Sequence, residues 1–308
     1  MRLRKVLAGA AAGVGLAALA NRRLASQAGP LPPALVGEQR TYRWRGFDVA
    51  YAEAGDPDDP DVLLVHGIHA AGSSVEFDGV FEALAEEYHV VAPDLPGFGR
   101  SDRPPATYTA SLYEEFVRDF ATDRTDDATC IATSLAGAYA ARVARDGAFA
   151  RLVLVCPTDR TARKRPLLRA AFRAPLAGEA LFNALVSRPS IEWFDAREGY
   201  YGGADRVTVD YQWRTTHQEG ARYAPASFVG GYLDPAYDLG EELAAVEVPV
   251  TLVWGREATV TPLSVGRALA DRADARLVVI DRARLLPHDE HPDSFLKAVE
   301  EDLPRLAQ

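Results

Sequence analysis

The chain has 308 residues, of which 48% are hydrophobic, and its formal net charge is −10. This length and apolar content suffice for one large α/β domain and exclude wholesale disorder, while the acidic balance argues against a nucleic-acid partner. Its two cysteines, Cys130 and Cys156, lie in apolar runs and indicate neither a disulfide scaffold nor a cysteine-ligated metal, so we expect no metal and no cofactor.

The N-terminal segment, residues 1–28, is predicted to stand apart from the globular part. The uncharged residues 6–20 lie between MRLRK and NRR, and as a helix they would rise about 22 Å, less than the ~30 Å core of a bilayer. Three interpretations stay open: a short membrane anchor flanked by cations, a cleaved export signal ending at Ala18-Leu19-Ala20, or an alanine-rich helix lying on the protein. We expect membrane association through residues 6–20, with a cytoplasmic or an exported protein as the alternatives.

Strands and helices alternate in the rest of the chain. Residues 29–40 contain several prolines and glycines and predict a linker, and alternating residues from Thr41 predict two strands that turn near Gly46. Solid apolar runs predict buried strands at 61–67, 89–97 (with its exit loop), 128–133, 151–156, 248–255 and 275–281, with helices at 73–87, 109–123, 135–144, 262–271 and from Pro292. This pattern is typical of a mostly parallel sheet with helices on both faces.

Residues 157–239 interrupt the alternation, because they contain helical patches but no clear buried strand. We expect them to form a helical cap over the carboxyl edge of the sheet, with the core made of residues 41–156 and 240–308. A basic run in the cap forms either a solvated helix face or a patch for anionic lipid headgroups: Arg160, Arg163, Lys164, Arg165, Arg169 and Arg173. Cap aromatics form either the roof of an apolar pocket or the core of the cap: Trp193, Phe194, Tyr200, Tyr201, Tyr211, Trp213 and Tyr223.

The segment ATSLA, residues 132–136, predicts a sharp turn from a strand into a helix. Alanines two residues before and after Ser134 leave room for such a turn, which would hold the serine hydroxyl out at the top of the sheet. A serine that only caps the helix is the alternative. HGIHAAGSS follows a buried strand and places the amide of Ile68 where, with the amide of Leu135, it would form an oxyanion hole.

Five motifs in this order resemble the α/β-hydrolase family, which includes epoxide-hydrolase-like, esterase-like and haloperoxidase-like proteins. They are HGIHAAGSS, PDLPGFGRSDRP, ATSLAG, VTLVWGREATVTPL and EHPDSF, and the resemblance covers about Thr41 to the end of the chain. It implies an eight-stranded sheet, a helical cap and a Ser…Asp…His triad.

Two triad positions depart from that family pattern. The acid usually follows the seventh strand as G-x-x-D, and here Ala258 stands at that position. The base usually follows the last strand, and here Leu285 stands there. A serine hydroxyl needs a positioned base, and losing one triad member costs on the order of 10⁴- to 10⁶-fold in turnover.

Substitutes are therefore needed for the base and the acid. His288, three residues beyond the usual position, is the predicted base, because a loop that folds back could bring it to Ser134. Of the other histidines, His66 and His69 belong to the oxyanion loop, and His217 could reach down from the cap. For the acid we expect Glu257, with Asp159 as the alternative.

Two functions stay open from the sequence. The first is a serine hydrolase of an ester or related acyl substrate, with Ser134 as nucleophile, Ile68 and Leu135 as oxyanion hole, and His288 and Glu257 as a displaced base and acid. The second is a non-catalytic member of the same fold that binds a small apolar ligand or a protein partner at a membrane. The retained serine turn favours the first, and Leu285 together with Ala258 favours the second.

Overall fold

The structure is a computed structural model that describes residues 2–161 and 163–304, with the side chains of the first helix described from Gly15 onward. Eight strands form one sheet in the order β1-β2-β4-β3-β5-β6-β7-β8. They are β1 (Glu38–Trp44), β2 (Phe47–Ala54), β3 (Asp61–Val65), β4 (His89–Pro93), β5 (Thr129–Thr133), β6 (Arg151–Val155), β7 (Val250–Gly255) and β8 (Arg276–Ile280). β2 is antiparallel to β1 and β4, and all other pairs are parallel, as predicted.

Helices cover both faces of the sheet. One face packs against α3 (Ala110–Arg124), α4 (Ala136–Arg145), α10 (Leu239–Ala244) and α11 (Leu263–Ala273). The other packs against the 3₁₀ helix η1 (Ser74–Phe77), α2 (Asp78–Ala85) and α13 (Pro292–Val299), with α12 (Pro287–Glu290) before and η3 (Glu300–Asp302) after α13. Along β5, Cys130 and Ala132 enter the first cluster, and Ile131 enters the second. Strands buried on both faces must be apolar at every position, which explains their unbroken apolar runs.

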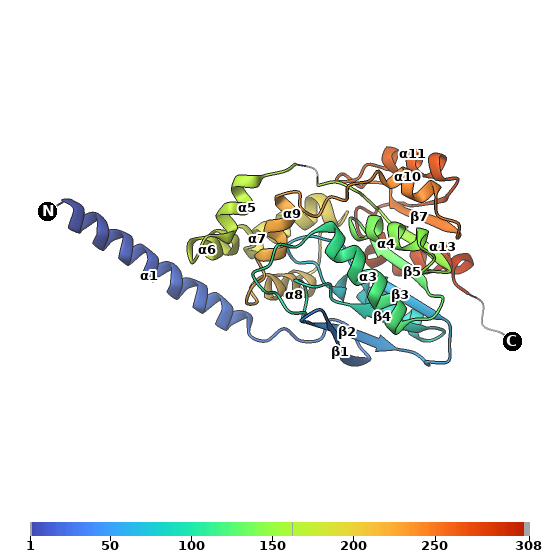
Figure 1. Cartoon of the computed structure of the whole chain (residues 1–308), viewed down its shortest axis with the longest axis horizontal. Coiled ribbons are helices and arrows are strands. Elements are labelled where there is room, and N and C mark those ends of the chain that lie inside the picture. Colours follow the sequence, from blue (N-terminus) through green and yellow to red (C-terminus); the bar gives the residue numbers. More distant parts are fainter. Residues whose placement is uncertain (1, 162, 305–308) are drawn as a thin grey trace.

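The segment between β6 and α10 lies at one end of the sheet, next to the N-terminal helix (Figure 1). It contains α5 (Pro166–Arg173), α6 (Ala177–Leu185), α7 (Arg188–Phe194), the π-helix η2 (Asp195–Gly199), α8 (Arg206–Thr216) and α9 (Tyr223–Val229), and its described part has no strand. We refer to this segment as the cap.

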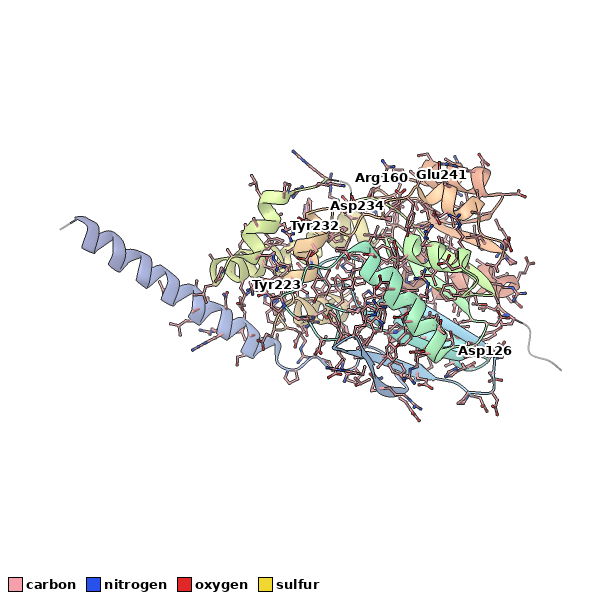
Figure 2. The ribbon with its side chains drawn as sticks, viewed as in Figure 1. Asp126, Arg160, Tyr223, Tyr232, Asp234 and Glu241 are labelled. Atoms are coloured by element: carbon pink, nitrogen blue, oxygen red, sulfur yellow. The ribbon has the colours of Figure 1, made fainter. Side chains whose placement is uncertain are left out.

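Several of the basic cap side chains contact aromatic rings or a carboxylate. The guanidinium of Arg169 lies 4.1 Å from the ring centroid of Tyr232, and that of Arg173 lies 5.4 Å from that of Tyr223. The Nζ atom of Lys164 lies 3.1 Å from Asp234, and Figure 2 labels the three partner residues in this region. Part of the basic run therefore holds the cap together instead of forming an open cationic face.

Helix α1 (Arg2–Ala28) begins away from the body and reaches the cap only with its second half (Figure 1). Asn21 and Ala28 are buried there, and Leu24 and Ala28 pack in one apolar cluster with α7 and α8. Their spacing of three to four residues gives one helical face toward the cap. Leu16 and Leu19 lie on the other side and are 69% and 64% exposed.

Within the described residues, no helix combines the length and the apolar character needed to cross a membrane. The segment predicted as a linker is shorter than expected, because β1 begins at Glu38. Leu35 just before it is buried in the core cluster under α2 and α13.

Candidate active site

Ser134 stands at a sharp turn between β5 and α4. Its backbone is in the left-handed region, with φ of 51°, and its amide donates to the carbonyl of Val155 on the neighbouring strand at 2.9 Å. Ala132 and Ala136 are fully buried, so larger side chains there would collide with their surroundings. The side chain of Ser134 is half-buried. The turn therefore has the geometry of a nucleophile elbow.

The loop after β3 lies directly against this turn. A Cβ atom at Gly67 would lie 3.3 Å from the Cβ of Ser134, so any larger residue there would push the loop and the turn slightly apart. Within the described part of the chain, the amides of Ile68 and Leu135 donate no hydrogen bond. The oxyanion hole at these two amides stays a prediction.

His66 holds that loop in place. Its Nε2 accepts a hydrogen bond from the amide of Leu95 at 2.9 Å, and its Nδ1 donates to the carbonyl of Gly67 at 2.8 Å. Burial lowers the pKa of His66, which keeps the ring neutral and suits one donating and one accepting nitrogen. His66 is a structural residue with no nitrogen left for a substrate.

The usual positions of the triad acid and base are apolar in structure as well as in sequence. Ala258 is buried in a cluster with Cys156 and Trp254, and Leu285 packs against the same cluster. The amide of Leu285 donates to the carbonyl of Gly199 at 3.1 Å, which fixes the loop after β8 to the π-helix of the cap. Neither position supplies a proton acceptor.

His288 does not take over the role of the base. Proline begins α12 just before it, and the ring turns into the core, 5.1 Å from the ring centroid of Phe77 and 5.7 Å from that of Phe295. It is fully buried, neither ring nitrogen has a hydrogen-bond partner among the described residues, and burial lowers its pKa to about 4. The hydrogen bonds that we predicted from His288 to Ser134 and Glu257 are therefore absent.

The two predicted acids also have other tasks. A carboxylate oxygen of Glu257 accepts from the amide of Ala283 at 3.2 Å, and its own amide donates to the carbonyl of Ala283 at 3.0 Å. Glu257 thus joins the loops after β7 and β8. Asp159 accepts from the amide of Leu239 at 3.0 Å, at the start of α10. Neither carboxylate is bonded to an imidazole.

A buried Glu–His pair beside the elbow was not anticipated from the sequence. Glu76 of η1 accepts with Oε2 from the amide of Gly67 and from the hydroxyl of Thr133, both at 2.9 Å. Its Oε1 lies 2.9 Å from Nε2 of His69. The available signal was Glu76 standing between the apolar Val75 and Phe77.

The Glu–His pair is strongly polarised. Burial alone would raise the pKa of Glu76, but the hydrogen bond and charge of His69 outweigh it and lower that pKa to about 2. Burial disfavours the imidazolium of His69, yet the hydrogen bond and charge of Glu76 raise its pKa above the ordinary value. Glu76 is therefore ionised, and His69 holds a proton more readily than a free imidazole.

An apolar cavity of about 350 Å³ lies between this loop and the cap. The loop contributes His69, Ala70 and Ala71, and the cap contributes Phe194 and Asp195 among others, whereas Ser134 is not one of the lining residues. Asp195 is buried, its Oδ2 has no hydrogen-bond partner among the described residues, and burial raises its pKa to about 6. Phe194 meets the expectation of an aromatic roof, but Trp213 packs beneath α1 instead.

The other histidines are placed away from the elbow. Nδ1 of His217 donates to the carbonyl of Trp213 at 2.7 Å, and its ring lies against the indole, with centroids 4.4 Å apart. His89 pairs with two carboxylates at the amino end of β4, and Nε2 of His291 bonds to the carbonyl of Arg282. These rings serve local packing.

Residues 62–298 match the family model described as the alpha/beta hydrolase family. Together with the sheet order and the elbow, this match shows that the chain belongs to the α/β-hydrolase family.

Two named relatives are similar to this chain over most of its length. The pimeloyl-[acyl-carrier protein] methyl ester esterase of Aeromonas hydrophila is 27% identical over 253 residues, which cover 78% of this chain and 94% of the relative. The uncharacterized hydrolase YugF of Bacillus subtilis is 24% identical over 272 residues, which cover 82% and 93%.

Solved structures share the fold. A serine hydrolase involved in carbazole degradation superposes with a TM-score of 0.71 at 22% identity and covers 86% of this chain and 98% of its own. A membrane phospholipase A described as a bacterial virulence factor superposes with a TM-score of 0.69 at 22% identity and covers 96% of this chain and 94% of its own.

Proposed function

We propose that the chain is a serine hydrolase of an ester or related acyl substrate, with Ser134 as the nucleophile. The left-handed backbone of Ser134 at the end of β5, together with two amides that donate no hydrogen bond among the described residues, is the observation that supports this most. A preformed pair of donors stabilises the oxyanion of an acyl-transfer intermediate, and losing one such donor costs about 10²- to 10³-fold in turnover. Membership of the hydrolase family agrees with this reaction class.

In the proposed reaction the Oγ atom of Ser134 attacks the carbonyl carbon of the substrate. The carbonyl oxygen becomes an oxyanion that accepts from the amides of Ile68 and Leu135. The alcohol leaves, and water then cleaves the acyl-enzyme. An apolar acyl group suits the cavity of about 350 Å³, which lies at the lower end of the usual volumes of small-molecule sites. The named activity of the Aeromonas relative, a methyl ester esterase, is compatible with this class.

A fluorophosphonate probe tests the nucleophile. Such probes phosphonylate only activated serines, so the wild type is expected to gain the mass of one probe, and Ser134→Ala none. Intact-protein mass spectrometry gives the labelled fraction as a function of time. If the wild type stays unlabelled, or if Ser134→Ala is labelled equally fast, the proposal fails.

A second candidate is a binding protein without catalysis. It is favoured by the apolar cluster at the usual acid and base positions, Ala258 and Leu285. This candidate predicts saturable binding of a small apolar ligand with no turnover of p-nitrophenyl butyrate above the Ser134→Ala background. The hydrolase predicts turnover that Ser134→Ala abolishes.

We also propose that α1 binds an anionic lipid surface. The helix carries exposed Leu16 and Leu19 beside exposed Arg22 and Arg23, and the sequence places three further cations among its first five residues. Apolar side chains next to cations suit the boundary of an anionic bilayer. The similar membrane phospholipase also matches 96% of this chain. The expected location is therefore a membrane surface.

A further inference from the structure

We infer that His69, held by Glu76, is the general base of this site and replaces the imidazole that Leu285 lacks. The inference rests on the proposed serine hydrolase function, and it names a catalytic pair that lies on the oxyanion loop and η1 instead of the loops after β7 and β8.

Glu76 connects the loop after β3 with the end of β5. One carboxylate oxygen accepts from the amide of Gly67 and from the hydroxyl of Thr133, which directly precedes Ser134. Gly67 is close to the serine as well, because a Cβ atom there would lie 3.3 Å from the Cβ of Ser134. The other oxygen accepts from His69. The imidazole is thus linked, through one buried carboxylate, to the residue before the candidate nucleophile and to the loop that packs against it.

The hydrogen bond to Glu76 also determines the tautomer of His69. Since Glu76 is ionised, neutral His69 carries its proton on Nε2 and keeps the lone pair on Nδ1. That lone pair accepts a long hydrogen bond of 3.3 Å from the amide of Ala71, which has to give way when Nδ1 takes a proton. The two ring nitrogens would then have the same roles as in a Ser-His-Asp triad, where one is hydrogen-bonded to a carboxylate and the other takes the proton.

The surroundings of His69 set it apart from the other histidines. Its side chain is 26% exposed and lines the apolar cavity, where Asp195 of η2 adds a second buried carboxylate. Both nitrogens of His66 form short hydrogen bonds of 2.8 and 2.9 Å, whereas Nδ1 of His69 accepts only the longer bond of 3.3 Å, and His288 is buried in the core. Within the described residues, His69 is the imidazole that combines a carboxylate partner with access to the cavity.

In the proposed steps His69 carries one proton from the serine to the leaving group. The Oγ–H bond of Ser134 breaks and the proton moves to Nδ1 of His69 while Oγ bonds to the carbonyl carbon. The imidazolium is stabilised by Glu76. His69 then gives the proton to the leaving alcohol oxygen as the C–O bond breaks, and the same two transfers with water release the acid. Transfer requires Nδ1 and Oγ to come within about 3.2 Å in the substrate complex, where such contacts tighten.

The test compares His69→Gln with His288→Gln, a matched change of another buried histidine. Labelling by fluorophosphonate is followed by mass spectrometry, and circular dichroism confirms that each variant is folded. His69→Gln is expected to slow labelling by about 10³-fold or more, whereas His288→Gln stays within about threefold of wild type. Wild-type labelling in His69→Gln overturns the inference while leaving the serine hydrolase intact. An unlabelled wild type overturns both.

The pH dependence of the labelling rate distinguishes a base from a residue with a purely structural role, because only a base sets its midpoint. The groups that face His69 are Glu76 of η1, Asp195 of η2, and His66 of its own loop. Because Glu76 raises the pKa of His69, labelling by the wild type should rise with pH through a midpoint above about 6.5. Glu76→Gln removes the charge and should move that midpoint down. An unchanged midpoint in Glu76→Gln overturns the inference even if His69→Gln does not fold.

Discussion

Leu285 packs against the same apolar cluster that buries Ala258. These are the two positions at which the family pattern places an imidazole and a carboxylate. The two apolar residues fit together, because a carboxylate at the buried position 258 would lack a partner while leucine stands at the partly buried position 285. The two positions should therefore be coupled.

Introducing both usual triad residues tests that coupling. Ala258→Asp alone should destabilise the fold by several kcal/mol, since an unpaired buried carboxylate is costly, and Leu285→His in addition should recover about 1–3 kcal/mol of it. Chemical denaturation of the four proteins measures the coupling. The double variant should hydrolyse p-nitrophenyl butyrate at least about tenfold faster than the wild type, and each single variant should not. If the wild type shows no turnover and only the double variant is active, the result supports the non-catalytic candidate.

The buried ring of His288 should make stability depend on pH. Its folded pKa of about 4 lies below the ordinary 6.5, so the unfolded chain binds the proton more readily. The free energy of unfolding should fall by about 1.4 kcal/mol per pH unit as pH decreases from 6.5 towards 4. His288→Leu should lose this component, and urea denaturation at several pH values measures it. If the free energy of unfolding of His288→Leu falls as steeply with decreasing pH as that of the wild type, other groups cause the effect.

Gly67→Ala should impair the site more than the fold. The added Cβ would lie 3.0 Å from Oγ1 of Thr133 and 3.3 Å from the Cβ of Ser134, so the loop must move away from the elbow. We expect labelling to slow by about 10- to 100-fold, with a loss of about 1–3 kcal/mol in the free energy of unfolding. Gly79→Ala is the control, because its nearest atom is a proline carbon 3.4 Å away. Normal labelling of Gly67→Ala would show that the loop plays no part.

The exposed leucines of α1 should carry lipid binding. Leu16→Gln with Leu19→Gln removes two largely exposed apolar side chains and should release most of the protein from vesicles of phosphatidylglycerol and phosphatidylcholine in a flotation assay. Val265→Gln, an exposed apolar position on α11, is the matched control and should leave binding unchanged. Equal flotation of all three proteins would exclude α1 as the lipid-binding element.

Elements with strong local signals could be predicted from sequence. Unbroken apolar runs locate the buried strands, and small residues around Ser134 locate the turn, because each depends on side chains within a few positions. The parallel sheet and its two helical layers follow from the alternation. The oxyanion role of the Ile68 and Leu135 amides stays a prediction, which was made from their positions just after β3 and β5.

The acid and base could not be predicted, because both depend on how loops fold in three dimensions. A span of three residues allowed His288 to reach Ser134, but Pro287 begins a helix that turns the ring towards Phe77. Glu257 was chosen for its place near Ala258, and its carboxylate bonds to a neighbouring loop instead. The pairing of His69 with Glu76 spans seven residues and exists only because η1 returns beneath Gly67.

The backbone of Ser134 has a consequence for how this protein could be stabilised. A residue with a Cβ atom in the left-handed region costs about 1 kcal/mol or more relative to glycine, which adopts it without penalty. Ser134→Gly should therefore raise the melting temperature while removing the hydroxyl. Selection for thermal stability alone would favour glycine at this position. Keeping the serine hydroxyl therefore lowers the stability of the fold in exchange for a candidate nucleophile.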